Sequence, residues 1–256
     1  MKHAETLAQR KAAIASALYA VSQVRFFTAF DDWLALAVNA FLRDDAAYMK
    51  IMSGYGPRIE GQKHPADHFA TALGAWMHAM QAEPQDYLGQ IYEEESITNT
   101  YKGQYFTPEP LVELMMGITC PELKDDQILA DPAGCGSGRM LIAGIRKNRF
   151  ATFVGVDTDL TCVHMTALNC LVRNANSYII HGNSLAMTAL GGFAVQRTWA
   201  GGELHRLTPE QAQKLIQAPF IVAPSQPSPQ PVVTTATPDD LPTFTANTKG
   251  QFGFGF

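Results

Sequence analysis

A glycine-rich run in the middle of the chain has the residue types and spacing of a ligand-binding turn. It extends from Asp131 to Gly138 with the sequence DPAGCGSG, and it follows the short apolar run 128–130. Its three glycines let the backbone approach a ligand closely, and the helix expected after them offers free N–H groups and the positive end of its dipole. The pattern favours cofactor binding, and the alternative is a glycine turn that holds no ligand.

The spacing of the glycines narrows the class of cofactor. Gly134, Gly136 and Gly138 form a G-x-G-x-G pattern after Asp-Pro. The turn that receives a dinucleotide pyrophosphate has the spacing G-x-G-x-x-G instead. We therefore expect a cofactor other than a dinucleotide.

Two more polar residues stand where neighbouring strands are expected to end. Asp157 follows the apolar run 152–156 and comes about 20 residues after the glycine turn, the interval at which a carboxylate reaches the hydroxyls of a ribose. The alternative is that Asp157 caps the helix beginning near Leu160, for which Asp159 is a competing cap. Asn183 follows a third apolar run, 178–180. Its amide either pairs with an adenine edge or forms an Asx turn without a ligand.

The elements that must position these residues alternate in type. We expect strands at 127–130, 152–156 and 178–180, and helices from the glycine turn to about 147 and from 160 to 174. Alternation of this kind predicts a parallel sheet with right-handed crossovers, whose ligands lie at the carboxyl ends of the strands.

The N-terminal third has the periodicity of packed helices instead. Two segments repeat apolar residues at i+3, i+4 and i+7, and the segment 53–65 between them is rich in turn formers. The apolar positions are Phe30, Leu34, Ala37, Val38 and Phe41 in the first segment, and Phe69, Leu73, Trp76, Met77 and Met80 in the second.

A further helix is expected just before the first strand. Thr107 has the residue type of an N-cap, and Pro108 would then occupy the first helical position. A single apolar stripe follows, made of Leu111, Leu114, Met115 and Ile118.

The composition excludes several classes of protein. The chain has 256 residues, 46% of them hydrophobic, and a net charge of -5 without any run of five like charges, so we expect no basic tail or stripe for nucleic acid. Its four cysteines show no C-x-x-C pairing, which argues against a zinc site or a disulfide framework and favours a reducing cytoplasm. The N-terminal segment lacks the apolar region of a signal peptide, and no run of 18 apolar residues occurs, so we expect neither secretion nor a membrane span.

Five motifs in one order carry a family resemblance. They are residues 86–93 (DYLGQIYE), 103–108 (GQYFTP), 131–138, 155–157 (GVD) and 182–185 (GNSL). Over residues 86–187 the chain resembles the modification subunits of type I restriction-modification systems, which are S-adenosylmethionine-dependent adenine-N6 DNA methyltransferases. The helical segment before residue 86 also resembles that family.

The resemblance implies the fold and its division into domains. We expect an α/β, Rossmann-like S-adenosylmethionine-dependent methyltransferase domain at 86–218, with a truncated sheet, preceded by a small α-helical domain at 1–85. Seven of the fifteen prolines fall between Pro219 and Pro242. We therefore expect the tail at 219–256 to be disordered.

Residue by residue, the resemblance implies a site for S-adenosylmethionine, and the cysteine spacing already leads us to expect no metal. The segment 104–108 would close over the methionine end of the cofactor. Asp131 would pair with its ammonium group, Asp157 would hold its ribose, and Asn183 stands where the family commonly has an aspartate that contacts the adenine amine. The implied cofactor-binding residues are Tyr105, Thr107, Pro108, Asp131, Ala133, Gly134, Gly136, Gly138, Asp157 and Asn183.

One motif of the family is missing. Its members carry Asn-Pro-Pro and an aromatic residue, which accept hydrogen bonds from the amine of a flipped adenine and stack on the base. The nearest segment here is 220–227, with Ala223 in the place of the asparagine, and alanine accepts no hydrogen bond. The catalytic residues are therefore unassigned, and the loss of such a group typically costs about 10² in rate.

We consider three functions. The first is a degenerate or partner-dependent member of the family that binds the cofactor and acts on DNA only with another chain. The second is an active site-specific DNA adenine methyltransferase, in which Ser225 or another group replaces the asparagine, or in which a partner chain supplies the missing strands and DNA contacts. The third is a non-enzymatic mimic of a modification subunit that interacts with restriction-modification complexes.

Overall fold

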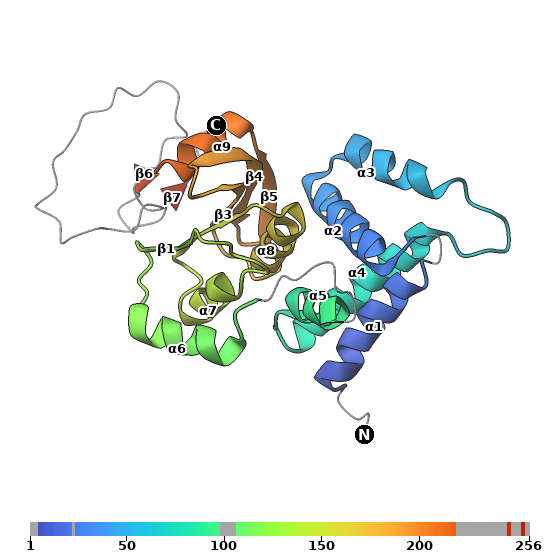
Figure 1. The fold of residues 1–256 in the computed structure, drawn as a ribbon, viewed down its shortest axis with the longest axis horizontal. Coiled ribbons are helices and arrows are strands. Elements are labelled where there is room, and N and C mark those ends of the chain that lie inside the picture. Colours follow the sequence, from blue (N-terminus) through green and yellow to red (C-terminus); the bar gives the residue numbers. More distant parts are fainter. Residues whose placement is uncertain (1–4, 22–23, 98–105, 219–244, 247–251, 254–256) are drawn as a thin grey trace, which may run out of the picture.

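Helices fill the N-terminal part of the molecule, and a sheet with flanking helices fills the part beside it (Figure 1). The computed structural model describes residues 5–21, 24–97, 106–218, 245–246 and 252–253. Within these residues the two parts share one hydrophobic core, which contains side chains of the helices and of the sheet alike.

Apolar faces build the N-terminal helices, as the periodicity predicts. Phe30 and Leu34 of the first predicted face and Phe69 and Trp76 of the second are buried, so both predicted helices are confirmed. The indole rings of Trp33 and Trp76 meet edge to face, with centroids 6.4 Å apart. The elements are α1 (Leu7–Tyr19), α2 (Phe26–Leu42), α3 (Asp45–Met52), α4 (Pro65–Ala82) and α5 (Tyr87–Ile97), with one 3-10 turn, η1 (Ser53–Tyr55), in the segment expected to be a loop.

The main sheet has five strands in the order β1-β2-β3-β4-β5. They are β1 (Ile128–Asp131), β2 (Thr152–Asp157), β3 (Ser177–Asn183), β4 (Thr188–Arg197) and β5 (Gly202–Leu207). β1, β2 and β3 are parallel, with Asp131 opposite Gly155 and Asp157 opposite His181, so the three predicted strands are confirmed. Their carboxyl ends bring Asp131, Asp157 and Asn183 to one edge of the sheet.

The parallel arrangement predicted for these three strands does not continue beyond β3, where no strand was predicted from the sequence. β4 pairs with β3, and β5 pairs with β4, in antiparallel orientation. The connections at 184–187 and 198–201 are too short for a parallel crossover, which needs about a dozen residues or more. Gly191 and Gly192 lie inside β4 and interrupt its apolar pattern, so the sequence gives little signal for this strand.

Helices cover both faces of this sheet. α7 (Arg139–Lys147) and α8 (Leu160–Val172) pack on one face, and α9 (Pro209–Ile216) packs on the other, where Ile216 belongs to the same cluster as Ile180. α8 is buried almost all round, because α2 packs on its side away from the sheet. There the Thr161 hydroxyl donates a hydrogen bond to Asp31 at 2.8 Å.

The helix before β1, α6 (Glu109–Thr119), begins one residue later than predicted. Its N-cap is Pro108 and not Thr107, and no side chain caps it. A second proline, Pro110, lies in the first turn, where the missing N–H leaves no hydrogen bond unmade.

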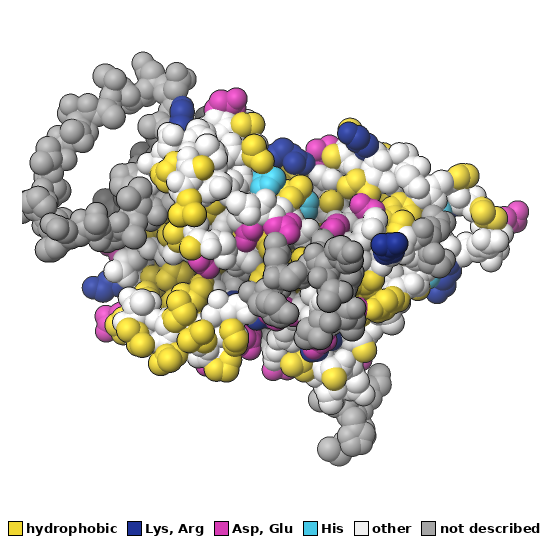
Figure 2. Space-filling view, in the orientation of Figure 1, with side chains coloured by type: hydrophobic (Ala, Val, Ile, Leu, Met, Phe, Trp, Pro, Cys, Tyr) yellow, Lys and Arg dark blue, Asp and Glu magenta, His cyan; other side chains and the backbone are white. Residues whose placement is uncertain are grey.

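The predicted apolar stripe of α6 faces away from the core. Its residues are 39–72% exposed, and Figure 2 shows hydrophobic side chains gathered over this helix. Val112 and Met116 form the buried side instead, and they pack against Ala143 of α7. The helix therefore has two apolar rows, only one of which is covered. The exposed residues are Leu111, Leu114, Met115 and Ile118.

The structure tests several further predictions from the sequence, some of them only in part. None of the described helices combines the length and the apolar character that crossing a bilayer requires. The four cysteines are free, and the described residues hold no cluster of three potential metal ligands. β6 (Thr245–Ala246) pairs with β7 (Phe252–Gly253), while the rest of the tail lies outside the described residues. The domain boundaries at 85/86 and 218/219 stay predictions.

Gly144 in α7 has no room for a side chain. A Cβ atom there would lie 2.9 Å from both Leu129 and Phe153. We expect Gly144→Ala to lower the free energy of unfolding by about 1–3 kcal/mol in chemical denaturation, because overpacking forces buried neighbours to move. The matched control is Gly117→Ala in α6, where a Cβ atom meets nothing within 4 Å. That variant should instead gain roughly 0.5–1 kcal/mol from helix propensity, and equal effects of the two variants would contradict the packing of α7.

Candidate functional site

The glycine run between β1 and α7 forms the tight turn that its sequence predicts. Gly134, Gly136 and Gly138 all have positive φ angles, of 102°, 57° and 87°. A Cβ atom at Gly136 would lie 2.6 Å from the ring of Phe106, and one at Gly138 would lie 2.9 Å from Thr166. At Gly134 the nearest atom is a carboxylate oxygen of Asp157, at 3.9 Å. Two glycines therefore admit close protein neighbours, whereas Gly134 has open space beside it.

Hydrogen bonds fix the turn from both sides. The N–H of Cys135 donates to Val156 O at 2.9 Å, and the N–H of Gly136 donates to Asp157 Oδ2 at 2.9 Å. The Thr166 hydroxyl of α8 donates to Gly136 O at 2.8 Å. Gly136 and Gly138 are buried within this arrangement, while Ala133 and Gly134 are exposed. The exposed pair is the part of the turn that a ligand can reach.

Asp157 at the end of β2 is bound into the turn and is not the cap of α8. Its Oδ1 atom accepts a hydrogen bond from the N–H of Asp159 at 2.9 Å, and its side chain is almost buried. Asp159 is the N-cap, because its Oδ1 accepts from the N–H of Thr161 at 2.8 Å. Burial raises the pKa of Asp157 above its ordinary value, although the backbone N–H groups counteract part of that effect.

Asp131 at the end of β1 faces the same turn. Burial and, to a smaller extent, electrostatic repulsion from Asp157 together raise the pKa of Asp131 from 3.8 to about 6. Two carboxylates thus share one poorly solvated edge of the sheet. A positively charged ligand group placed between them would relieve this repulsion.

The segment entering α6 lies against the buried side of the turn. Besides its contact with Gly136, Phe106 stacks on Tyr92 of α5, with ring centroids 5.6 Å apart. Thr107 O accepts a hydrogen bond from Arg139 at 3.2 Å, and Thr107 and Pro108 are exposed. Tyr105, which the sequence assigns to the same segment, lies outside the described residues.

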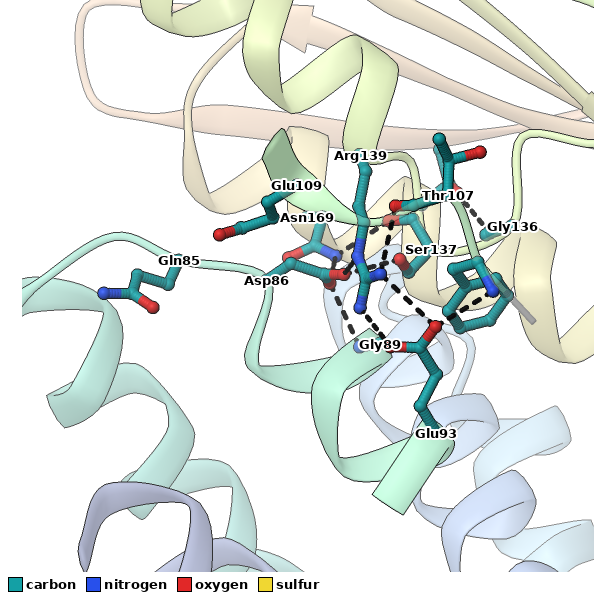
Figure 3. Close-up of polar contacts among 12 residues, drawn as sticks. Gln85, Asp86, Gly89, Glu93, Thr107, Glu109, Gly136, Ser137, Arg139 and Asn169 are labelled. Atoms are coloured by element: carbon teal, nitrogen blue, oxygen red, sulfur yellow. Dashed lines mark hydrogen bonds and ion pairs between the residues drawn. The ribbon is translucent and has the colours of Figure 1, made fainter. Parts of the chain in front are cut away.

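A buried ion pair joins this segment to the turn, and our sequence reasoning gave it no role (Figure 3). Arg139, the first residue of α7, donates to Asp86 at 2.8 Å and to Glu93 at 2.5 Å. The Asp86 carboxylate is 0% exposed and also accepts from Ser137 Oγ at 2.6 Å and Asn169 Nδ2 at 3.1 Å. Burial lowers the pKa of Arg139, but Glu93 and Asp86 outweigh it, so the net pKa is raised.

A signal for this ion pair was present in the sequence. Asp86 and Glu93 are seven residues apart around the start of one helix, so they lie on the same face, and Arg139 follows the glycine turn directly. An acidic pair with this spacing beside a buried turn requires a cation. The partner itself is distant in sequence, and only the fold identifies it.

Asn183 lies at the end of β3, at the same edge as the two aspartates. Its Oδ1 atom accepts hydrogen bonds from the N–H groups of Leu185 and Ala186, both at 3.0 Å. This is the Asx turn that we gave as the alternative to adenine binding. The turn occupies the side-chain oxygen, and the contact between Asn183 and an adenine stays a prediction.

A cavity of about 400 Å³ opens beside the candidate ribose residue. It lies between the start of α8 and the adjoining ends of β3, β4 and β5, and its lining includes Leu160, His181, Phe193 and Arg206. The ring of His181 is 3.1 Å from Thr158 O, one residue after Asp157. Gly191 and Gly192 also line the cavity.

The segment 220–227, the nearest candidate for the missing catalytic motif, lies outside the described residues. Comparison with known families gives one match: residues 83–196 match the family described as N-6 DNA methylase. The matched segment contains α5, the ion pair, the glycine turn and the three parallel strands. No curated protein matches the chain.

The raised pKa of Asp131 predicts how stability depends on pH. In the unfolded chain an aspartate loses its proton near pH 4, whereas the pKa of Asp131 in the fold is about 6. As the pH rises from 4 to 6 the unfolded state loses the proton first, so the wild type loses at most roughly 3 kcal/mol of stability. We expect Asp131→Asn to melt close to the wild type at pH 4 and at a higher temperature at pH 7.

The control for this measurement is Asp126→Asn, which changes an exposed aspartate just before β1. Its melting temperature should follow that of the wild type at both pH values. A melting temperature of Asp131→Asn that never exceeds the wild-type value at pH 7 would show that the carboxylate is not destabilised in the fold.

Proposed function

Because residues 83–196 belong to the N-6 DNA methylase family, we propose that this chain binds S-adenosylmethionine as part of a system that methylates adenine in DNA. The five-stranded mixed sheet with its helices fits the α/β fold of methyltransferases that use this cofactor. The observation that carries the proposal is the pair of interacting carboxylates at this edge of the sheet, Asp131 and Asp157, of which Asp157 lies beside the open side of Gly134.

The residues at this edge suit the groups of the cofactor. S-adenosylmethionine supplies a methyl group on a positively charged sulfur, and its methionine end carries an ammonium group. Asp131 would pair with the ammonium, and the exposed backbone at Ala133 and Gly134 would approach the amino-acid moiety. Asp157 would accept hydrogen bonds from the ribose hydroxyls, since each carboxylate oxygen can accept more than the one bond it has. The cavity beyond Thr158 would give the adenine ring apolar surroundings.

The proposal separates cofactor binding from methyl transfer. Transfer to adenine needs acceptors that hold the exocyclic amine in line with the methyl group, and the family's motif for this is absent from the sequence. Ala223 stands in the place of the asparagine. We therefore infer a degenerate or partner-dependent protein, in which the chain alone transfers methyl groups slowly.

Two features of the described residues support completion by another polypeptide. β1 has β2 as its one partner among the described strands, so the other edge of β1 offers backbone groups for pairing. The second feature is the exposed apolar stripe of α6, because Met116 on the other side of this helix already packs with Leu129 of β1, while the stripe itself is not covered by the described residues. Apolar side chains of a partner would cover this stripe. The type I resemblance, a cytoplasmic location and contact with restriction-modification subunits stay predictions.

Isothermal titration tests the cofactor proposal. The wild type should bind S-adenosylmethionine, and Asp131→Asn should weaken binding at least tenfold at pH 7.5, because a hydrogen bond to a charged group typically contributes about 1.5–3 kcal/mol. Asp126→Asn serves as the control and should bind as the wild type does. If the folded wild type takes up no cofactor at high micromolar concentrations, the proposal is wrong.

A methyl-transfer assay on mixed-sequence duplex DNA tests the second part. The isolated chain should label adenine at a rate at least 100-fold below that of an adenine-N6 methyltransferase with an intact motif, because the positioned acceptor is missing. Robust labelling by the isolated chain would instead favour the fully active enzyme with another group in the place of the asparagine.

The same assay tests the role of α6. If extract from the source cells raises the rate, Leu114→Glu should abolish the gain, because a charge in the stripe opposes apolar packing. Met49→Glu changes an equally exposed apolar residue on α3 and should keep the gain. If both variants keep the gain in rate, the stripe is not the docking surface.

A further inference from the structure

Glu93 lies where three parts of the molecule meet. It belongs to α5, and its Oε1 atom accepts a hydrogen bond from the backbone N–H of Phe106 at 2.9 Å. Both of its oxygens also accept from Arg139, at 3.3 and 2.5 Å (Figure 3). One carboxylate thus holds the start of the Phe106–Pro108 segment and the first residue after the glycine turn.

Arg139 is itself fixed, so it provides a rigid support. Its Nε atom donates to the fully buried Asp86, and its Nη1 atom donates to Thr107 O. The guanidinium also lies 5.5 Å from the centroid of the Phe106 ring. Because its N–H groups donate hydrogen bonds on several sides, Arg139 has little freedom to follow a displaced segment.

Phe106 connects Glu93 and Arg139 to the glycine turn. Its ring lies against Gly136, where even a single added carbon would come within 2.6 Å of it. The ring is held from behind by Tyr92, on the same helix as Glu93. A small shift of the Phe106 backbone would therefore move the ring relative to the turn.

We propose that Glu93 and Arg139 are positioning residues for the amino-acid end of the cofactor, acting by holding Phe106 and Thr107 against the turn at Gly136. This inference rests on the proposed function and names the part of the ligand that it affects. The ribose and adenine groups are expected at Asp157 and in the cavity beyond Thr158, whose lining includes neither Glu93 nor Phe106. We therefore expect their binding not to depend on the Glu93 contact.

A stabilising role alone does not account for this ion pair. Buried pairs of charges are weak contributors to stability, because the loss of solvation offsets much of their attraction. Well-packed apolar side chains would join α5 to α7 equally well. The pair instead fixes the relative orientation of the segments it joins, since the carboxylate and the guanidinium form hydrogen bonds only in a narrow range of geometries.

The test compares two ligands on matched variants. S-adenosylmethionine carries the amino-acid end, and 5′-methylthioadenosine keeps the adenosine and lacks that end. Glu93→Gln should weaken S-adenosylmethionine about tenfold by titration and leave 5′-methylthioadenosine within about twofold by ligand-observed NMR. The control is Glu94→Gln, which removes the neighbouring surface pair with Lys11 and should bind both ligands as the wild type does.

A double-mutant cycle shows whether Glu93 acts through Phe106. Phe106→Ala should give the same selective loss of S-adenosylmethionine, and adding Glu93→Gln to it should weaken binding no further. Melting temperatures of all variants, measured alongside, ensure that each is folded at the temperature of titration.

The outcomes separate the inference from the proposed function. Wild-type protein that binds neither ligand overturns the proposed function and the inference with it. Wild-type protein that binds S-adenosylmethionine, with Glu93→Gln binding it equally well, overturns the inference alone. Equal weakening of both ligands, or additive losses in the cycle, also overturns it, since either result would mark Glu93 as a general structural residue.

Discussion

The buried carboxylate of Asp86 is the interaction on which the rest of this structure depends. A fully buried charge is costly unless hydrogen bonds surround it. Here the donors come from four places: its own helix through Gly89, the glycine turn through Ser137, α7 through Arg139, and α8 through Asn169. Satisfying one charge therefore fixes the helical part, the turn and the central helix of the sheet relative to one another.

In the glycine turn, by contrast, the carboxylates repel each other. Asp131 and Asp157 repel each other at a poorly solvated edge, while the backbone around them is held by hydrogen bonds. This repulsion lowers the stability of the fold, while the arrangement of the turn is complete before any ligand binds. A ligand of positive charge would be favoured there by the field of the protein, and its binding would require little rearrangement of the turn.

The sequence predicted those strands and turns whose residue patterns are continuous along the chain. The apolar runs ending at Asp131 and Asp157 and the glycines between them mark strands and a turn, and the structure has them within one or two residues. β4 escaped prediction because Gly191 and Gly192 break its apolar pattern, and its burial comes from α8 on one face and α9 on the other. The apolar stripe of α6 was predicted, but periodicity cannot say which of two apolar rows is covered. The partner of Asp86 was missed because the pairing joins residues more than 50 positions apart.

The position of α8 has a consequence for motion. Most of this helix is buried, between the sheet and the helices α2 and α5, and Leu160 at its start is exposed. A hinge movement that separated the two parts would expose its apolar side chains and break the bond between Thr161 and Asp31. The helical part therefore cannot swing open as a lid over the cofactor edge, and the two parts are expected to unfold in one cooperative transition.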